Sequence, residues 1–309
     1  MPRAAIQLHT LRHSDTPLPD LIDRIAAAGF EGVEFAGRVR EASEADLAAT
    51  AMALERTGVT PIGAHVGIHD LERNLPSIVS RYRRLGCDTL VVPHVSPTQF
   101  RHPRRLRRLA DRIRQLDNRL RHWGFSLQYH NQHFEFLPVT GPALQRALES
   151  GLPDGVVGAA TRFKGQLRHR AGLDTFTETT FDRLLAETRD TGLRFEVDVG
   201  GVAMAGRDPV GVLDAIGDRL GSVHLKDVTR GRLPMVGGHR SVTPGTGLVD
   251  LPAIGAAATR NECPWLVYEH DDSTDPALAL HRGRAAVTAA GGDRAPGPDA
   301  PGQKAVAGD

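Results

Sequence analysis

The sequence has few of the residues that mark several common protein classes. Its 309 residues include only two cysteines, Cys87 and Cys263, which are too far apart to suggest a disulfide framework. Strand-like residues flank both, so we expect buried free thiols and a reducing compartment, the cytoplasm. No apolar run approaches the roughly 20 residues that a membrane-spanning helix needs. The formal net charge of +1 provides no general attraction for nucleic acid or an anionic membrane.

Lysine is scarce, although basic residues are not. The 38 Lys+Arg residues include lysine only at positions 164, 226 and 304. Arginine is therefore the default cation of this chain, and Lys226 stands directly after a strand-like segment. This position indicates a role for a compact ammonium group, with an incidental surface lysine as the alternative.

Short apolar segments alternate with helix-length segments along most of the chain. We expect strands over residues 4–9, 32–35, 61–65, 89–94, 125–130, 194–198, 222–225 and 265–269. We expect helices over residues 18–28, 42–56, 71–85, 103–123, 209–220 and 276–290. Eight strands that alternate with helices predict an α/β fold, the closed parallel (β/α)8 TIM barrel.

One barrel domain accounts for residues 1–290, with two additions. The loop over residues 137–176 is rich in Gly, Thr and Arg, and it is either a lid that grips phosphate or a solvated insertion. The tail over residues 291–309 is mostly Gly, Ala, Pro and Asp, so we expect it to be disordered. The arginine-rich helix over residues 103–123 carries an apolar stripe at helical spacing, which predicts a solvated arginine face and no nucleic-acid site.

Polar side chains stand at or next to the carboxyl ends of the predicted strands. They are His9, Glu34, His65, His94, His130, Asp198, His224 and Glu269. In a TIM barrel this rim carries the active site. We expect the first four, His9, Glu34, His65 and His94, to contact the substrate.

Three of these rim residues, Asp198, His224 and Glu269, suit a divalent cation. The fourth ligand is left open between Glu135 and His130. Oxygen donors with an imidazole suit Mn²⁺ first, with Mg²⁺, Co²⁺ or Zn²⁺ as alternatives. Such an ion next to a carbonyl and a hydroxyl acidifies the C–H bond between them.

Proton transfer at that carbon needs a base and a group that holds the developing oxyanion. Glu135, Glu269 and His130 are the candidates for moving the proton. Lys226 is the candidate for holding the oxyanion. The resulting enediolate can be reprotonated, which gives isomerisation or epimerisation, or it can expel a β-substituent.

Several short motifs occur in an order that resembles the sugar phosphate isomerase/epimerase family. The most specific is Val223-His224-Leu225-Lys226-Asp227, and the others include Tyr129-His130-Asn131, Phe134-Glu135-Phe136, Glu196-Val197-Asp198 and Val267-Tyr268-Glu269. The resemblance implies a xylose isomerase-like barrel and a divalent metal held by Glu135 or His130, Asp198, His224 and Glu269. Two positions depart from the family pattern, which usually has a His where Gln132 stands and a Glu where Thr246 stands.

These observations favour a divalent-metal-dependent isomerase or epimerase of a sugar, sugar derivative or cyclitol. A dehydratase or lyase that acts on an oxidised sugar or inositol is the first alternative. A metal-dependent nuclease shares the barrel and is another, and a non-catalytic sugar-binding barrel would explain Gln132 and Thr246. The expected partner is a small carbohydrate, with no nucleic acid and no membrane, and a homodimer is left open.

Overall fold

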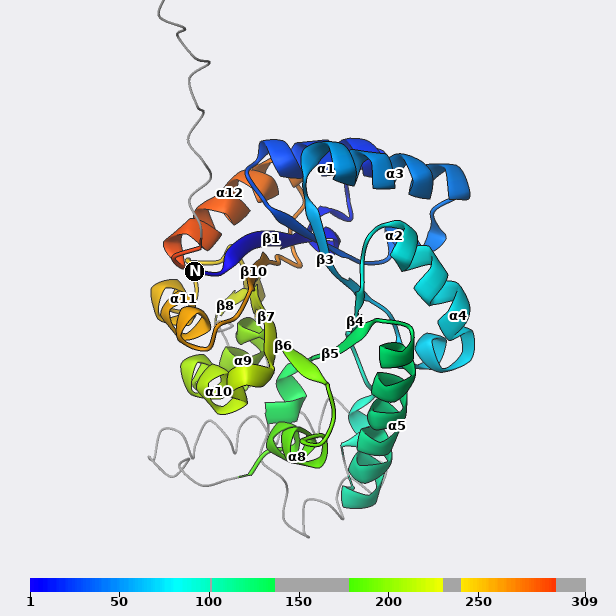
Figure 1. Cartoon of the computed structure of the whole chain (residues 1–309). Coiled ribbons are helices and arrows are strands. Elements are labelled where there is room, and N and C mark those ends of the chain that lie inside the picture. The colour runs from blue at the N-terminus through cyan, green and yellow to red at the C-terminus, as the bar shows by residue number, and fades with distance from the viewer. Residues whose placement is uncertain (101, 137–177, 230–239, 293–309) are drawn as a thin grey trace, which may run out of the picture.

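A closed barrel of parallel strands forms the centre of the protein (Figure 1). The structure, a computed structural model, describes residues 1–100, 102–136, 178–229 and 240–292. Around the barrel the strands follow the order β1, β10, β7, β6, β5, β4, β3, β2. Their bounds are β1 Arg3–Gln7, β2 Gly32–Phe35, β3 Thr60–His65, β4 Thr89–Val92, β5 Ser126–His130, β6 Arg194–Asp198, β7 Leu220–Leu225 and β10 Trp265–Tyr268. The predicted TIM barrel is confirmed.

Helices surround the strands on the outside (Figure 1). The α-helices are α1 Leu18–Ala27, α2 Arg38–Glu41, α3 Glu44–Thr57, α4 Ile68–Arg84, α5 Pro103–His122, α8 Thr180–Glu187, α9 Val199–Met204, α10 Pro209–Ile216, α11 Leu251–Arg260 and α12 Pro276–Ala289. Short 3₁₀ helices are η1 Leu8–Leu11, η2 Pro97–Gln99, η3 His133–Phe136 and η4 Gly217–Arg219. A small antiparallel hairpin pairs β8 Asp227–Thr229 with β9 Arg240–Val242.

Sequence patterns explain where several helices begin and end. Ser43 caps α3 with its side chain, and Asp46 returns the bond to the Ser43 backbone, which is a capping box. Gly58 ends α3 in the left-handed conformation, φ 71°, that favours glycine. The sequence did not predict α2, α8, α9, α11 or the β8–β9 hairpin. The whole predicted loop (137–176), and residues 293–309 of the predicted tail (291–309), lie outside the described residues.

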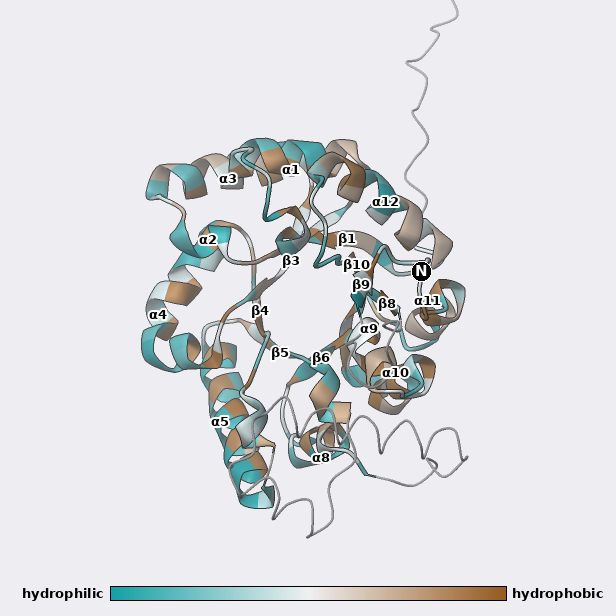
Figure 2. Cartoon of the chain, turned by 180° about the vertical axis from the view of Figure 1, so that it is seen from behind, coloured by the Kyte–Doolittle hydropathy of each residue, from teal (hydrophilic) through white to brown (hydrophobic). Residues whose placement is uncertain are grey.

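The apolar core lies between the strands and the surrounding helices. The apolar stripe of α5 is buried against the barrel, whereas arginines along the helix are exposed, as predicted. Figure 2 shows this as alternating brown and teal along α5. Cys87 and Cys263 are buried free thiols, as predicted. Among the described helices, none combines the length and hydropathy that crossing a membrane requires.

The barrel interior near the carboxyl ends of the strands is polar. Strand residues alternate between the interior and the helix layer. On β6, for example, the polar Glu196 and Asp198 alternate with the apolar Phe195 and Val197. Fully or nearly fully buried polar residues include Gln7, Glu34, His130, Glu196, Asp198, Ser222, His224 and Glu269. Because buried polar groups need partners, this polar interior marks the part of the barrel to search for a site.

Candidate functional site

One imidazole and two carboxylates converge at the rim of the barrel. They belong to His130 at the end of β5, Asp198 at the end of β6 and Glu269, which follows β10. One ligand atom from each lies within 4.8 Å of the others. All three side chains are buried, with residue exposures of 4–6%. We call these three residues the rim trio.

The backbone around Asp198 fixes the direction of its carboxylate. Asp198 Oδ1 accepts a bond from the Gly201 N–H at 2.9 Å and thereby caps α9. The Asn131 side chain accepts from the Asp198 N–H at 3.0 Å and donates to its carbonyl oxygen at 3.2 Å. The cap thus occupies Oδ1 and leaves Oδ2 on the side of the Lys226 ammonium, 3.5 Å away.

Lys226 lies beside two members of the rim trio. Its Nζ is 3.2 Å from Glu269 Oε2, 3.5 Å from Asp198 Oδ2 and 3.0 Å from Asp271 Oδ2. Burial disfavours the ammonium, but these carboxylates hold the pKa of Lys226 well above its usual value. Burial also disfavours the Glu269 carboxylate, yet Lys226 and His224 hold its pKa well below its usual range. Glu269 is therefore ionised beside a fixed ammonium.

A second polar cluster adjoins the trio at His130 and Glu269 and consists of Glu34, His65, Glu196 and His224. We call it the inner cluster. Glu196 Oε2 is 2.7 Å from His65 Nε2, 3.2 Å from His224 Nε2 and 2.9 Å from His130 Nδ1 of the trio. Glu34 Oε2 is 2.8 Å from His224 Nε2 and 3.3 Å from His65 Nε2. His65, His130, Glu196 and His224 also satisfy the spacing of metal donors.

The imidazoles and the carboxylates of the inner cluster carry opposite charges and pair with one another. Burial disfavours the imidazolium, but Glu34 and Glu196 raise the pKa of His65 to about 10 and that of His224 well above its usual value. Burial likewise opposes the ionisation of Glu196, whereas His224 and His65 hold its pKa well below the ordinary range. The inner cluster is therefore a network of ion-paired hydrogen bonds.

The structure places Glu135 apart from both groups. Its carboxylate is fully buried and accepts from the Tyr129 hydroxyl at 2.8 Å and from the Gln132 N–H at 3.3 Å. Burial raises the pKa of Glu135 to about 8. Tyr129 packs against Phe195 in the apolar layer outside the barrel, because it alternates with the inward-facing His130. Of the two alternatives for the strand-five ligand, His130 is the one that this arrangement brings to the rim.

The four residues predicted to contact a substrate separate into two pairs. Glu34 and His65 belong to the inner cluster, and Glu34 is only 1% exposed. His9 and His94 are exposed at the rim, where the His94 ring meets the edge of Phe134. His9 and His94 are thus the exposed members of this set, whereas 14% of the His65 side chain is exposed.

The sequence pattern pointed to neither Gln7 nor Asn131, and it placed Glu196 beside Asp198 without assigning it to the site. Gln7 donates to Glu34 Oε2, and Glu196 binds three imidazoles. Strand alternation alone puts Glu196 on the same face as Asp198. Asn131 could not be placed in this way, because its role depends on the lateral pairing of β5 with β6. The two departures from the family pattern make local contacts here: Gln132 Nε2 donates to Pro93 O at 3.0 Å, and Thr246 Oγ1 to Thr243 O at 2.7 Å.

The rim donors fit a divalent cation. Carboxylate oxygens together with imidazole suit Mn²⁺, Co²⁺ or Zn²⁺. Mg²⁺ would fit if most of the ligands are oxygens. Three carboxylates, from Asp198, Glu269 and Asp271, share the Lys226 ammonium, so negative charge remains for a cation to balance. His224 Nδ1 lies 2.8 Å from Glu269 Oε2, which places a second imidazole beside the trio. The rim trio therefore fits a cation in chemical type and in position, and His224 adjoins it through Glu269 while its donor spacing belongs to the inner cluster.

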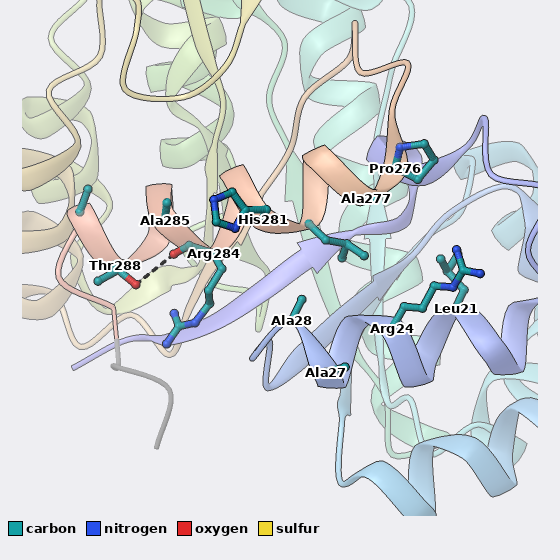
Figure 3. Close-up of a pocket in the computed structure, with 12 residues that line it drawn as sticks. Leu21, Arg24, Ala27, Ala28, Pro276, Ala277, His281, Arg284, Ala285 and Thr288 are labelled. Atoms are coloured by element: carbon teal, nitrogen blue, oxygen red, sulfur yellow. Dashed lines mark hydrogen bonds between the residues drawn. The ribbon is translucent and has the colours of Figure 1, made fainter. Parts of the chain in front are cut away.

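A separate groove of about 940 Å³ lies on the outside of the barrel, between α1 and α12 (Figure 3). Its walls are mostly small or apolar side chains, with Arg24, His281 and Arg284 around them. None of the predicted site residues lines it. We therefore assign the groove no part in the chemistry of the rim.

No family model matches this sequence, and no curated protein sequence matches it. Solved structures do resemble it. A sugar phosphate isomerase/epimerase from Parabacteroides distasonis ATCC 8503 is 16% identical with a TM-score of 0.67, over 91% of this chain and 95% of that one. The D-psicose 3-epimerase of Clostridium cellulolyticum H10, solved with D-tagatose, is 12% identical with a TM-score of 0.62, over 93% and 97%.

The probable 3-DHS dehydratase AsbF of Bacillus anthracis, which is involved in petrobactin synthesis, also resembles the chain. It is 11% identical with a TM-score of 0.64, over 92% of this chain and 98% of that one. At such identities the likenesses establish the fold, a xylose isomerase-like TIM barrel, as the sequence predicted.

Proposed function

We propose that this protein is a divalent-metal-dependent isomerase or epimerase of a sugar, sugar derivative or cyclitol. The reaction moves a proton on the carbon next to a carbonyl and proceeds through an enediolate. The observation that carries the proposal is the convergence of the rim trio beside Lys226, which brings metal donors and an oxyanion partner together. Mn²⁺ is the first metal to test.

The protein's own residues would divide the work as follows. His130, Asp198, His224 and Glu269 would hold the cation. When bound, the metal supplies polarisation of the substrate carbonyl and acidity to the adjacent C–H bond. The exposed rim imidazoles of His9 and His94 would meet the substrate hydroxyls.

Lys226 would stabilise the substrate oxyanion, and Glu269 would accept the substrate proton. The ammonium of Lys226 turns toward the substrate oxygen on which negative charge develops. Its movement away from Glu269 Oε2, 3.2 Å distant, removes the main attraction that keeps the pKa of Glu269 low. The Glu269 carboxylate then becomes a better base for the substrate proton.

Elimination is the second candidate, because the same enediolate can expel a β-substituent. The likeness to the probable dehydratase AsbF, over 92% of this chain, supports elimination as the second candidate reaction. The two reactions differ in their products. Incubation with ketoses and inositols in D₂O, followed by NMR, would show deuterium at one carbon without loss of water for an isomerase or epimerase.

Metal analysis and the same NMR assay test the proposal together. The purified protein should contain or take up one divalent ion, and Asp198→Asn and Glu269→Gln should each lose both the ion and turnover. The control is Glu55→Gln, an exposed carboxylate on α3, which should behave like the wild type. Unchanged turnover in both site variants would reject the proposal, and tight sugar binding without any metal requirement would favour a non-catalytic barrel.

A further inference from the structure

We infer that Glu196 and Glu34 are positioning residues that determine which ring nitrogen of His130 and of His224 faces the rim. The inference rests on the proposed function, since it concerns the imidazoles that would hold the metal. Histidine ligands commonly donate their second ring N–H to a carboxylate, which fixes the tautomer and the orientation of the ring. The inner cluster supplies such a carboxylate to each of the two imidazoles.

His130 is held from behind by Glu196. Its Nδ1 lies 2.9 Å from Glu196 Oε2, and both residues are buried. An Nδ1–H that donates to this carboxylate leaves Nε2 with the lone pair. The adjacent backbone pairing of His130 with Glu196 across β5 and β6 keeps the two side chains side by side. Glu196 therefore selects Nε2 of His130 as the nitrogen available to a cation.

Glu34 holds His224 through Nε2, the other ring nitrogen from the one by which Glu196 holds His130. Its Nε2 lies 2.8 Å from Glu34 Oε2, and its Nδ1 lies 2.8 Å from Glu269 Oε2 of the rim trio. The inner carboxylate thus occupies one nitrogen and leaves Nδ1 on the rim side. Since β1 and β10 lie between β2 and β7 around the barrel, this contact crosses the interior rather than joining neighbouring strands.

Glu196 is better suited to orient a ligand than to be one. Its Oε2 lies within 3.2 Å of three imidazole nitrogens, and its Oε1 accepts from the Ser222 hydroxyl at 2.9 Å. Both oxygens are thus engaged, and the residue is 0% exposed. By contrast, Asp198 Oδ2 has the Lys226 ammonium at 3.5 Å as its one ion-pair contact within the described part of the chain. A cation that enters from the rim therefore reaches the oxygen of Asp198 first.

His65 allows the two inner carboxylates to lie close together. Its Nε2 is 2.7 Å from Glu196 Oε2 and 3.3 Å from Glu34 Oε2, so one imidazole bridges both. Its ring stacks parallel to that of His224, with centroids 5.7 Å apart. His65 is therefore assigned to the support of the metal-binding imidazoles, in place of its predicted contact with substrate.

The test measures Zn²⁺ affinity and histidine tautomers in the full-length protein. Glu196→Gln should weaken Zn²⁺ binding about 10–100-fold in a chelator competition, with one equivalent still bound at saturation. Ring ¹⁵N NMR should show His130 with its proton on Nδ1 in the wild type both before and after Zn²⁺ is added, and metal-free Glu196→Gln should lose that preference. Glu34→Gln should act in the same way on His224, and it provides a second variant if the first does not fold.

Glu72→Gln is the matched control. Glu72 is also a carboxylate beside a histidine, with Oε2 3.5 Å from His69 Nδ1, but it lies on the outer helix α4. This variant should bind Zn²⁺ like the wild type. Equal Zn²⁺ affinity in Glu196→Gln and the wild type would overturn the inference, as would ligation of His130 through Nδ1. Two equivalents in the wild type and one in Glu196→Gln would also overturn it, by making Glu196 a ligand. A wild type that binds no divalent ion would instead contradict the proposed function.

Discussion

At the scale of single residues, Glu135 shows how one buried carboxyl can link stability to pH. Burial raises its pKa to about 8, against an ordinary value of about 4.3 for glutamate. The folded protein therefore holds this proton more tightly than the unfolded chain does. The stabilising contribution is complete below the ordinary pKa and is lost as the pH rises toward 8.

We predict that Glu135→Gln removes this part of the pH dependence. The variant should be more stable than the wild type above pH 8, by on the order of 4 kcal/mol, and should show little or no gain near pH 4. Urea unfolding across this pH range measures the difference, with Glu55→Gln as the exposed control. Parallel stability curves for wild type and Glu135→Gln would show that Glu135 does not titrate in this range.

Lys226 and a divalent cation would compete for the same carboxylates. The ammonium lies 3.2–3.5 Å from oxygens of Glu269 and Asp198. Two like charges about 4 Å apart repel by several kcal/mol at an effective dielectric constant of about 20. Removing the ammonium should therefore favour the metal while removing the partner of the substrate oxyanion.

We predict that Lys226→Met binds Mn²⁺ at least about tenfold more tightly than the wild type. Calorimetric titration measures the affinity, and Arg24→Gln, at an exposed cation of the outer groove, provides the control. Weaker Mn²⁺ binding in Lys226→Met would mean that the ammonium organises the carboxylates for the metal and does not compete with it.

At the scale of elements, one carboxylate organises the loop that leads into α11. Asp227 follows β7 and is fully buried. Its two oxygens accept backbone N–H groups of Val228, Gly245, Gly247, Leu248 and Val249 at 2.7–3.0 Å. A Cβ on Gly247 would lie 2.4 Å from Asp227 Oδ1, which explains the glycine. Asp227 thus joins the end of β7 to the loop that leads into α11.

We predict that Asp227→Ala destabilises the protein by about 4 kcal/mol, since several buried N–H groups would lose a charged acceptor. The matched control is Asp250→Ala, which removes the single side-chain cap of α11 at Ala253 N and should cost only about 1 kcal/mol. Chemical denaturation gives both values. Similar losses in the two variants would show that the loop contacts of Asp227 contribute little.

At the scale of the whole molecule, one face of α12 packs against the barrel and another lines the outer groove. Gly283 faces the barrel, where a Cβ would lie 2.5 Å from the buried ring of Tyr268. Ala285, two residues later, is exposed and lines the outer groove between α1 and α12 (Figure 3). One helix therefore offers two small residues in contrasting surroundings.

We predict that a larger side chain destabilises the protein at position 283 and is tolerated at position 285. Gly283→Ala should lower the free energy of unfolding, because overpacking of about 1–3 kcal/mol exceeds the gain of about 1 kcal/mol from helix propensity. Ala285→Leu should change it by no more than about 0.5 kcal/mol. Thermal and urea unfolding test the pair. A large loss in Ala285→Leu would indicate that the groove is filled in solution.

The sequence by itself determined the architecture. Alternating apolar segments and helix-length segments carry the periods of strand and helix, and eight repeats leave a closed parallel barrel as the natural arrangement. The same local logic identified Asp198, His224 and Glu269, because strand ends in such a barrel meet at one rim. It did not predict α11, where five alanines and glycines in ten residues weaken the amphipathic pattern.

Only the tertiary structure decided which polar residues act together. Glu135 and His130 are five positions apart, and local spacing does not tell which of them faces the barrel interior. The 3₁₀ helix after β5 decides it, because it turns Glu135 toward the Tyr129 hydroxyl. The contact between Glu34 and His224 joins residues 190 positions apart. Such contacts depend on barrel closure, because it brings distant strands within the length of a side chain across the interior.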